Sequence, residues 1–279
     1  MPHHDLLSHS PLGRTTDYGD SYNPDLLFPI SRLEARRQIG IQDNLPFKGA
    51  DLWSAYELSW LNPKGKPQIA LAHFSFPCTS PNIIESKSFK LYLNSLNNTP
   101  FDNADAVKDT MRKDLSKAAG SEICLNLILP EDFGNQIIQP LEGICLDHLD
   151  ISCRHYTPAP ELLQTNESAD IVEETLTSDL LKSNCPVTGQ PDWGSIRISY
   201  KGRPINHESL LQYIVSFRNK NEFHEQCVER IFMDIRMQCK PRELTVFARY
   251  TRRGGLDINP WRSNIETAQE PAFSRHARQ

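Results

Sequence analysis

Two stretches of this 279-residue chain carry the same pattern 121 residues apart. Residues 88–98 read SFKLYLNSLNN, and residues 209–219 read SLLQYIVSFRN. Their apolar residues fall at 89, 92, 93 and 96 and at 210, 213, 214 and 217, which is the spacing of one buried face of a helix. The repetition predicts two copies of one helical element.

A second helix and a strand are predicted after each of these helices. Apolar residues at helical spacing follow in both halves, namely Val107, Met111 and Leu115 in the first and Val228, Ile231, Phe232 and Ile235 in the second. The strand-like runs Cys124–Leu129 and Leu244–Tyr250 come next. Each half therefore reads as strands, two consecutive helices and further strands. This order predicts an α+β fold in which an antiparallel sheet carries the paired helices on one face.

A second echo lies before the helices, at an offset of 140 residues. Asn184–Trp193 reads NCPVTGQPDW and Asn44–Trp53 reads NLPFKGADLW, so that Asn, Pro, Gly and Trp recur. The residues after each tryptophan alternate between apolar and polar, which is the pattern of a strand with one buried face. Cys185 and Asp192 do not recur, because the earlier stretch has leucines in their places.

We interpret the two echoes as the duplication of one α+β module. The first module is expected over residues 1–156 and the second over residues 157–279. Residues 157–183, which are rich in Pro, Glu, Asp and Ser and show little periodicity, are the expected linker. Folding needs the same residues in both copies, whereas chemistry needs a residue in only one copy. The unmatched Cys185 and Asp192 are therefore candidates for a reaction.

The bulk composition predicts a cytoplasmic protein. The net charge of −5 gives no electrostatic footprint for nucleic acid or for an anionic membrane. The first 20 residues show no signal pattern, and no apolar run approaches the ~18 residues of a membrane span. The seven cysteines are scattered, without a C-x-x-C pair or zinc-finger spacing, which indicates a reduced compartment and no metal site.

Cys185 and Asp192 have the chemistry of a nucleophile and a proton carrier. A thiolate is the reactive form of cysteine, and a free thiol ionises only near pH ~8.5, so it needs a partner. A carboxylate across the Pro-Gly-Pro turn can accept the thiol proton or donate a proton to a substrate. The alternative is that Cys185 is a packed thiol and Asp192 a turn residue that bonds backbone amides.

The start of the first repeated helix carries Glu85, Ser86 and Lys87. A helix N-terminus with a nearby lysine favours an anion, and Glu85 could accept hydrogen bonds from a cationic or amidine-like group. The alternative is an ordinary charged helix start. The second half has Asn206, His207 and Glu208 in the same places, so this feature also belongs to one half only.

Two further motifs lie in the second half. His224 and Glu225 form an HE pair, but the residue needed to complete H-E-x-x-H is Val228, so a zinc-protease motif is excluded. Arg253 and Gly254 belong to an Arg-Arg-Gly-Gly run that suits close approach to a phosphate, although a solvated turn explains it equally. Neither a Rossmann nor a P-loop motif occurs in the sequence.

Taken together, five stretches resemble the QueF family, the NADPH-dependent 7-cyano-7-deazaguanine reductases of queuosine biosynthesis. They are Glu85–Tyr92, Asn184–Asp192, Ser216–Asn219, Phe223–Glu225 and Arg253–Gly255, in the order of the family. The resemblance runs from about residue 10 to residue 262 and is greatest to the longer, two-module branch. In that branch the Glu-Ser-Lys signature and the cysteine lie in different halves.

The resemblance implies the tunnelling fold, a cytoplasmic homodimer and the reduction of a nitrile. The nitrile of 7-cyano-7-deazaguanine would become the primary amine of 7-aminomethyl-7-deazaguanine, with the consumption of two NADPH. Cys185 would form a covalent thioimide with the nitrile carbon. Asp192 would supply a proton to the nitrogen, and His224 would handle a second proton or bind the substrate.

The resemblance also implies two sets of binding residues. The deazapurine would be bound by Ile84, Glu85, Ser86, His224 and Glu225. The NADPH phosphates would be bound by Ser86, Lys87, Arg253 and Gly254. Because the second module lacks the Glu-Ser-Lys signature, it is not expected to hold a complete site of its own.

Two alternatives remain open at this point. One is another enzyme of the same fold, such as a GTP cyclohydrolase or a pterin enzyme, although the Cys and His residues do not assemble into the metal set that a zinc-type cyclohydrolase needs. The other is a purine-binding or tRNA-binding module without turnover. The acidic net charge disfavours tRNA, and the presence of both Cys185 and Asp192 disfavours an inactive site.

Overall fold

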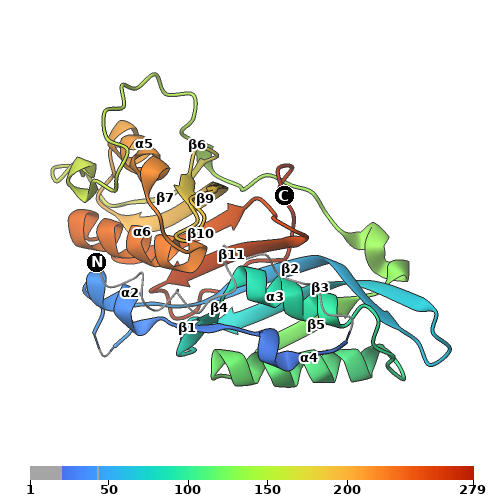
Figure 1. Ribbon diagram of the computed structural model, residues 1–279. Coiled ribbons are helices and arrows are strands. Elements are labelled where there is room, and N and C mark those ends of the chain that lie inside the picture. Colours follow the sequence, from blue (N-terminus) through green and yellow to red (C-terminus); the bar gives the residue numbers. More distant parts are fainter. Residues whose placement is uncertain (1–20, 43) are drawn as a thin grey trace. The chain divides into compact units, whose positions relative to one another are not determined.

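The computed structural model describes residues 21–42 and 44–279 (Figure 1). The first 20 residues, whose sequence shows no signal pattern, lie outside the described residues. The structure is a mixed α+β fold with a large, mostly antiparallel sheet. Its described residues divide into two compact units: unit 1 comprises 21–34, Asp51–Ile137 and Arg252–Asp257, and unit 2 comprises 35–42, 44–50, Ile138–Thr251 and Ile258–Gln279.

Unit 1 contains the first pair of predicted helices. Its helices are α3 (Ser86–Ser95) and α4 (Ala104–Ala119), and its strands are β1 (Pro29–Ser31), most of β2 (Lys48–Leu61), β3 (Pro67–Pro77), β4 (Asn82–Ile84) and β5 (Cys124–Ile128). Strand β3 lies between β2 and β5 and pairs antiparallel with β5. Strands β1 and β4 form a separate antiparallel pair.

Unit 2 contains the second pair of predicted helices. Its helices are α2 (Leu33–Gln38, from Ala35 onward), α5 (His207–Ser216) and α6 (His224–Cys239), and its strands are β6 (Ile144–Cys145), β7 (Val172–Ser178), β8 (Lys182–Asn184), β9 (Pro191–Gly202), β10 (Glu243–Tyr250) and most of β11 (Leu256–Ser263). Strand β9 pairs antiparallel with β7, β8 and β10, and β10 pairs antiparallel with β11. The short pair β6–β7 is parallel.

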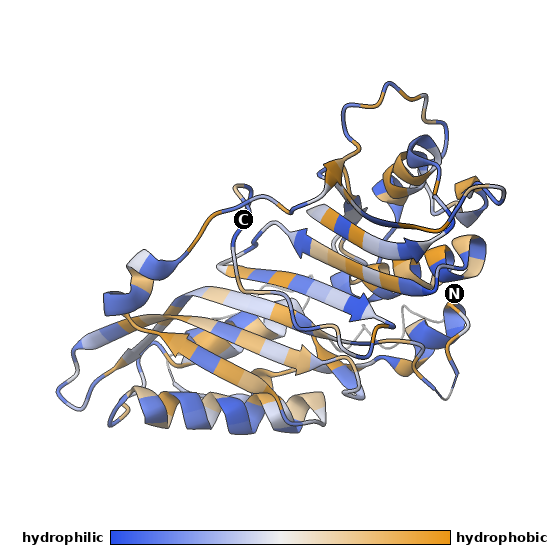
Figure 2. Ribbon diagram, turned by 180° about the vertical axis from the view of Figure 1, so that it is seen from behind, coloured by the Kyte–Doolittle hydropathy of each residue, from blue (hydrophilic) through white to orange (hydrophobic). Residues whose placement is uncertain are grey.

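The predicted helical faces are confirmed. Phe89, Tyr92 and Leu96 of the first stretch and Leu210, Tyr213 and Phe217 of the second are fully buried. The predicted core positions of the second helices, at 107, 111 and 115 and at 228, 231, 232 and 235, have no exposed surface. Figure 2 shows hydrophobic and hydrophilic bands alternating along the strands. The α+β class and the antiparallel sheet are therefore confirmed, because the apolar spacing decided which face each element buries.

The 140-residue echo is corrected by the strand pairing. In unit 1 the strand that pairs with the strand after the helices is β3, and in unit 2 it is β9. By pairing, β9 therefore corresponds to β3, whereas the echo aligns β9 with β2. Asn, Pro and Gly are common in turns and Trp is common in strands, so their recurrence did not mark equivalent places.

The expected linker at residues 157–183 contains regular structure. It holds the short 3₁₀ turn Pro160–Leu162 and the whole of β7, which pairs along β9. Strand β7 reads VEETLTS, so polar residues dominate and the alternation that marks a strand is weak. The module boundary at residue 157 stays a prediction.

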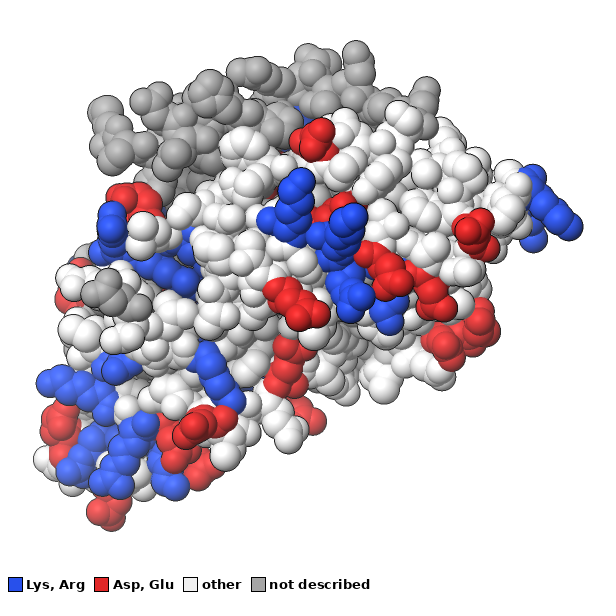
Figure 3. Space-filling view, turned by 90° about the horizontal axis from the view of Figure 1, so that it is seen from below, with Lys and Arg blue, Asp and Glu red and all other residues white. Residues whose placement is uncertain are grey.

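Two further properties are the distribution of surface charge and the character of the helices. On the face seen in Figure 3, Lys and Arg side chains are interspersed with Asp and Glu. Among the described helices, none combines the length and the apolar character needed to cross a membrane.

Candidate active site

The hairpin of β8 and β9 holds Cys185 and Asp192. Ser183 lies opposite Asp192 in the register, and Asn184 lies opposite Pro191. The loop between the strands is closed by two backbone hydrogen bonds, from the Cys185 amide to the Gln190 carbonyl (2.9 Å) and from the Gly189 amide to the Cys185 carbonyl (3.0 Å). Gly189 has a φ of +67°, a conformation that glycine adopts readily. The thiol is thus carried by a closed loop, and it is partly exposed.

The alternation of strands places the carboxylate on the covered face of the sheet. Residues two apart along a strand share a face, so Asp192 faces the same side as the buried Ile196 and Ile198 of β9. Its cross-strand neighbour Ser183 shares that face. Only 6% of Asp192 is exposed, and Ser183 is fully buried. Asp192 is therefore a buried carboxylate and not a solvated turn residue.

His224 begins helix α6 and lies beside Asp192. The segment before α6 is tied to the hairpin, since the Asn184 amide donates to the Lys220 carbonyl (2.8 Å) and the Glu222 amide donates to the Asn184 carbonyl (3.1 Å). These bonds bring the Nε2 atom of His224 to 3.2 Å from the Oδ1 atom of Asp192. The next residue, Glu225, is almost fully buried at the same helix end. All four candidates from unit 2 thus lie on one hairpin and one helix start.

The positive charge of Lys182 also acts on this carboxylate. The Nζ atom of Lys182 donates to the Asn184 side chain (2.7 Å) and to the Arg218 carbonyl (2.6 Å). Burial and the nearby Arg218 lower the pKa of Lys182, while the charge of Asp192 acts in the opposite direction. Asp192 therefore interacts with a cation as well as with the imidazole.

Helix α3 in unit 1 begins at the Glu-Ser-Lys signature. Ile84 ends strand β4 and is buried, and Glu85 is the N-cap of the helix. One carboxylate oxygen of Glu85 accepts from the Lys87 amide and the other from the Ser88 amide, both at 2.7 Å. Burial raises the pKa of Glu85, and these two hydrogen bonds and the charges of Lys90 and Lys87 partly offset that effect. Glu85 therefore helps to build the helix start as well as being a candidate for substrate binding.

The Arg253–Gly255 turn belongs to unit 1 and lies against α3. The Arg253 amide donates to the Leu256 carbonyl (2.8 Å), which closes the turn. A Cβ atom added to Gly254 would lie 3.1 Å from the Cδ atom of Lys90, and Gly254 has a φ of +53°. Lys87 and Lys90 are three residues apart on α3, so they share a face. Gly254 therefore lies against the helix that carries Ser86 and Lys87, and its neighbour there is Lys90, a residue that was not among the sequence predictions.

The turn between β2 and β3 in unit 1 has the same backbone hydrogen bonds as the Cys185 loop. The Asn62 amide donates to the Lys66 carbonyl and the Gly65 amide to the Asn62 carbonyl, as Cys185 and its loop partners do in unit 2. Leu61 exchanges bonds with Thr99 and Phe101 as Asn184 does with Lys220 and Glu222. By these bonds Asn62 corresponds to Cys185, and Gln68, next to the strand-opening Pro67, corresponds to Asp192.

This counterpart turn satisfies its own polar groups. The Oδ1 atom of Asn62 accepts from the Lys64 amide (2.9 Å) and the Lys66 amide (3.0 Å). A hollow of about 480 Å³ lies beside it, lined in part by Asn62, Gln68 and Asp102. The side chain at the cysteine position is therefore used to build the turn.

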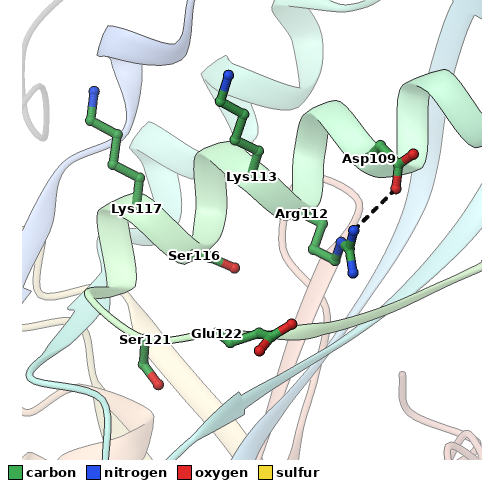
Figure 4. Close-up of a pocket in the computed structure, with 7 residues that line it drawn as sticks. All are labelled: Asp109, Arg112, Lys113, Ser116, Lys117, Ser121 and Glu122. Atoms are coloured by element: carbon green, nitrogen blue, oxygen red, sulfur yellow. Dashed lines mark hydrogen bonds and ion pairs between the residues drawn. The ribbon is translucent and has the colours of Figure 1, made fainter.

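A second hollow in unit 1 lies away from every candidate residue. It has a volume of about 540 Å³ and runs along the outer side of α4, where the sticks in Figure 4 show Lys113 and Lys117 pointing away from Glu122. Arg112 pairs with Asp109 on the same helix at 3.4 Å. These are exposed side chains of a solvated helix face, so the hollow is not part of the candidate site.

Comparison with known proteins identifies the family. The family model described as "Nitrile reductase, 7-cyano-7-deazaguanine-reductase N-term" matches residues 18–127, and the model described as "QueF-like protein" matches residues 191–269. Proteins named NADPH-dependent 7-cyano-7-deazaguanine reductase from Albidiferax ferrireducens and from a Polaromonas species are each 59% identical, covering 97% of this chain and 98% of their own. One from Bordetella avium is also 59% identical, covering 98% and 99%. The chain belongs to the QueF family.

One solved structure gives a weaker match to this QueF-family chain. The apo form of the archaeosine synthase QueF-Like is 16% identical and covers 35% of this chain and 95% of its own, with a TM-score of 0.30. That likeness is too low to support a conclusion about the fold. The two family models together cover the signature, Asp192, His224, Glu225 and the Arg253–Gly255 turn, whereas Cys185 lies between the matched ranges.

Proposed function

We propose that Cys185, Asp192 and His224 carry out, in this chain, the reaction for which its QueF-family relatives are named. That reaction is the NADPH-dependent reduction of 7-cyano-7-deazaguanine, here to 7-aminomethyl-7-deazaguanine, in queuosine biosynthesis. The observation that supports the assignment is the joining of a cysteine loop to a buried carboxylate–imidazole pair. A nucleophile with adjacent proton-handling groups is what covalent catalysis on a nitrile requires.

The first step forms a bond between the Cys185 sulfur and the nitrile carbon. The sulfur electron pair attacks, one π bond of the nitrile breaks, and the nitrogen takes a proton, which gives a covalent thioimide. Asp192 is placed to pass the proton from the thiol to that nitrogen, because it lies on the strand next to the cysteine loop. The 3.2 Å contact with His224 holds the carboxylate in one orientation.

Two reductions follow at the same carbon. Bound NADPH would supply a hydride for each. After the first, the carbon–sulfur bond breaks and Cys185 leaves as a thiolate, so the substrate becomes an imine. After the second, the imine becomes the primary amine, and the nitrogen gains a further proton. The Asp192–His224 pair is the described group that can deliver it.

Recognition of the deazapurine is assigned to carboxylates at two helix starts. In this proposal Glu85 of unit 1 and Glu225 of unit 2 would each accept from N–H groups of the heterocycle, and Ile84, Ser86 and His224 would be the other binding residues. Each carboxylate oxygen of Glu85 already accepts one helix amide, and each retains a second lone pair for a ligand. The two amide bonds would hold the carboxylate in place before substrate binds.

The residues around α3 fit the phosphates of NADPH. Ser86, Lys87, Arg253 and Gly254 are assigned this role, and Lys90 joins them because it contacts Gly254. Lysine and arginine side chains together with amides at a helix N-terminus suit anionic oxygens. At Gly254 the absence of a side chain leaves the backbone of the turn accessible next to the lysine.

The finer structural expectations remain part of this proposal. We infer two copies of one tunnelling-fold module, because the two units repeat the element order and the turn hydrogen bonds. Residues 1–156 and 157–279 are the proposed modules. We further propose a cytoplasmic homodimer, since two-module QueF proteins are expected to pair.

The decisive experiment is anaerobic mixing of the protein with 7-cyano-7-deazaguanine. We expect a thioimide absorbance band before NADPH is added and its decay, with consumption of two NADPH per substrate, afterwards. A protein that forms no adduct and oxidises no NADPH with this nitrile would contradict the assignment.

A further inference from the structure

The imidazole of His224 has a stacking partner that the sequence did not point to. The ring of Tyr250, the last residue of β10, lies parallel to it, with the ring centroids 3.9 Å apart and an angle of 8° between the planes. Tyr250 has no exposed surface. One face of the imidazole is therefore covered by a side chain that is itself fixed by the core.

Strand β9, which carries Asp192, also determines the position of Tyr250, because it pairs with β10. In the β9–β10 register Tyr250 lies opposite Gly194, which is two residues from Asp192 and on the same face of the sheet. A Cβ atom added to Gly194 would lie 3.2 Å from the Cε1 atom of Tyr250 and 3.3 Å from its Cδ1 atom. Because Gly194 has no side chain, the ring of Tyr250 can occupy this space and contact His224 at the start of α6.

The hydroxyl of Tyr250 interacts with the buried side chains of Cys227 and Ser183. Among the described residues, the buried Nδ1 atom of His224 has no hydrogen-bond partner. The contact of Tyr250 with His224 is therefore made by the ring, and no hydrogen bond from a described residue to Nδ1 orients the imidazole.

We propose that Tyr250 is a positioning residue for catalysis and that Gly194 makes its position possible. The stacked ring fixes the plane of the His224 imidazole, so that Nε2 stays directed at Asp192. This inference rests on the proposed roles of His224 and Asp192. An imidazole with neither a ring partner nor a bond at Nδ1 would rotate about its side-chain torsions, and a displacement of about 1 Å at a catalytic group lowers a rate on the order of 100-fold.

Three variants distinguish the contribution of the Tyr250 ring to catalysis from that of its hydroxyl and from that of general packing. Tyr250→Phe keeps the ring and should retain most of the wild-type kcat. Tyr250→Leu removes it and should lower kcat roughly 10- to 100-fold, with KM for the nitrile changed much less, because binding groups remain. Gly194→Ala, which moves the ring by a few tenths of an ångström, should give a smaller loss in the same direction.

Tyr213→Leu is the matched control. Tyr213 is also fully buried in unit 2, but its ring makes an edge-to-face contact with Phe217 and its hydroxyl donates to Asp234 (2.6 Å). The Tyr213→Leu variant should have a melting temperature at least as low as that of Tyr250→Leu. It should keep the wild-type kcat at a temperature where both variants are folded.

The kinetic experiment measures kcat, KM and the melting temperature of all four variants and of His224→Ala. A wild-type kcat in Tyr250→Leu, or an equal loss in Tyr250→Phe and Tyr250→Leu, overturns the positioning role while leaving the proposed function intact. A wild-type kcat in His224→Ala would instead overturn the proposed role of the imidazole, and the inference with it. The expected result is a loss that follows removal of the ring, is restored by phenylalanine and is absent from the Tyr213 control.

Discussion

The Nε2 atom of His224 lies 3.2 Å from the Oδ1 atom of Asp192, and both side chains are nearly buried. Two residues that the sequence suggested for separate proton transfers therefore form one carboxylate–imidazole pair. Whatever changes the charge or orientation of one changes the surroundings of the other. The pair should behave as a unit in every experiment that substitutes one of its members.

Asp192→Asn should leave the fold intact and slow thioimide formation roughly 10²- to 10⁴-fold, because an amide cannot carry the proton. His224→Ala should also slow turnover, and the double variant should lose less than the product of the two single losses. Single-turnover absorbance of the thioimide measures the rates, and thermal unfolding checks the fold. Strictly multiplicative losses would show that the two residues act independently.

Cys185→Ala should abolish the covalent adduct and NADPH oxidation, because no other thiol lies in the hairpin loop next to Asp192. Cys153→Ala is the matched control, since Cys153 is similarly half-buried but lies outside the site. Intact-protein mass spectrometry after mixing with the nitrile gives the adduct mass. A substrate adduct that persists without the Cys185 thiol would rule out this nucleophile.

Lys87→Ala, Lys90→Ala and Arg253→Ala should weaken NADPH use with a smaller effect on adduct formation. Loss of a charge-assisted phosphate contact costs on the order of 1.5–3 kcal/mol, which is about tenfold to a hundredfold in affinity. Lys117→Ala, on the solvated face of α4, is the control. Normal NADPH use combined with failure to form adduct would place these side chains at the deazapurine instead.

Asn62→Cys should not create a second reaction site, although Asn62 is the backbone counterpart of Cys185. Its loop faces Gln68 in place of Asp192, and the start of α4 offers Asp102, Asn103 and Ala104 but no histidine. The substitution is best made in a Cys185→Ala background, where mass spectrometry should find no adduct. An adduct on the introduced thiol would mean that the loop alone is sufficient for the addition step.

His73 in strand β3 should make the folded state sensitive to acid. Burial lowers the pKa of His73 from 6.5 to about 4, so the unfolded chain binds a proton more readily than the folded protein. Above pH 6.5 the titration of His73 does not reduce the free energy of unfolding. As the pH falls from 6.5 toward 4, the free energy of unfolding decreases, because the unfolded chain takes up the proton first. His73→Gln should reduce the difference between urea midpoints at about pH 7 and about pH 4.5, whereas the exposed His148→Gln should not. Identical differences in the wild type and His73→Gln would contradict this origin.

The elements were predictable because burial follows spacing. Phe89, Tyr92 and Leu96 lie on one helical face in the sequence and are buried in the structure. Strand β7 was not predictable, because its residues are mostly polar and its place depends on pairing with β9. The equivalence of strands between the two units was also not predictable from short echoes, since only the pairing reveals that β9 corresponds to β3.

The candidate site was likewise predictable from the sequence only in part. Cys185, Asp192 and His224 were found through their residue types and the family resemblance, whereas the contacts of Tyr250, Gly194 and Lys90 depend on tertiary packing. The echo aligned Leu52 with Asp192, and that sequence argument loses its force because the backbone counterpart of Asp192 is Gln68. A leucine at position 192 would therefore place an apolar side chain against His224 without any precedent in the other unit.

The nucleophile loop spans Cys185–Gln190, one residue more than its counterpart Asn62–Lys66, yet both are closed by the same two backbone hydrogen bonds. Turns at hairpin ends accept an extra residue without changing the register of the strands. Under the proposed duplication, the two turns differ in length by a single codon, and both closing hydrogen bonds are kept. The length of this turn is therefore independent of the strand pairing that holds Asp192 and its counterpart Gln68.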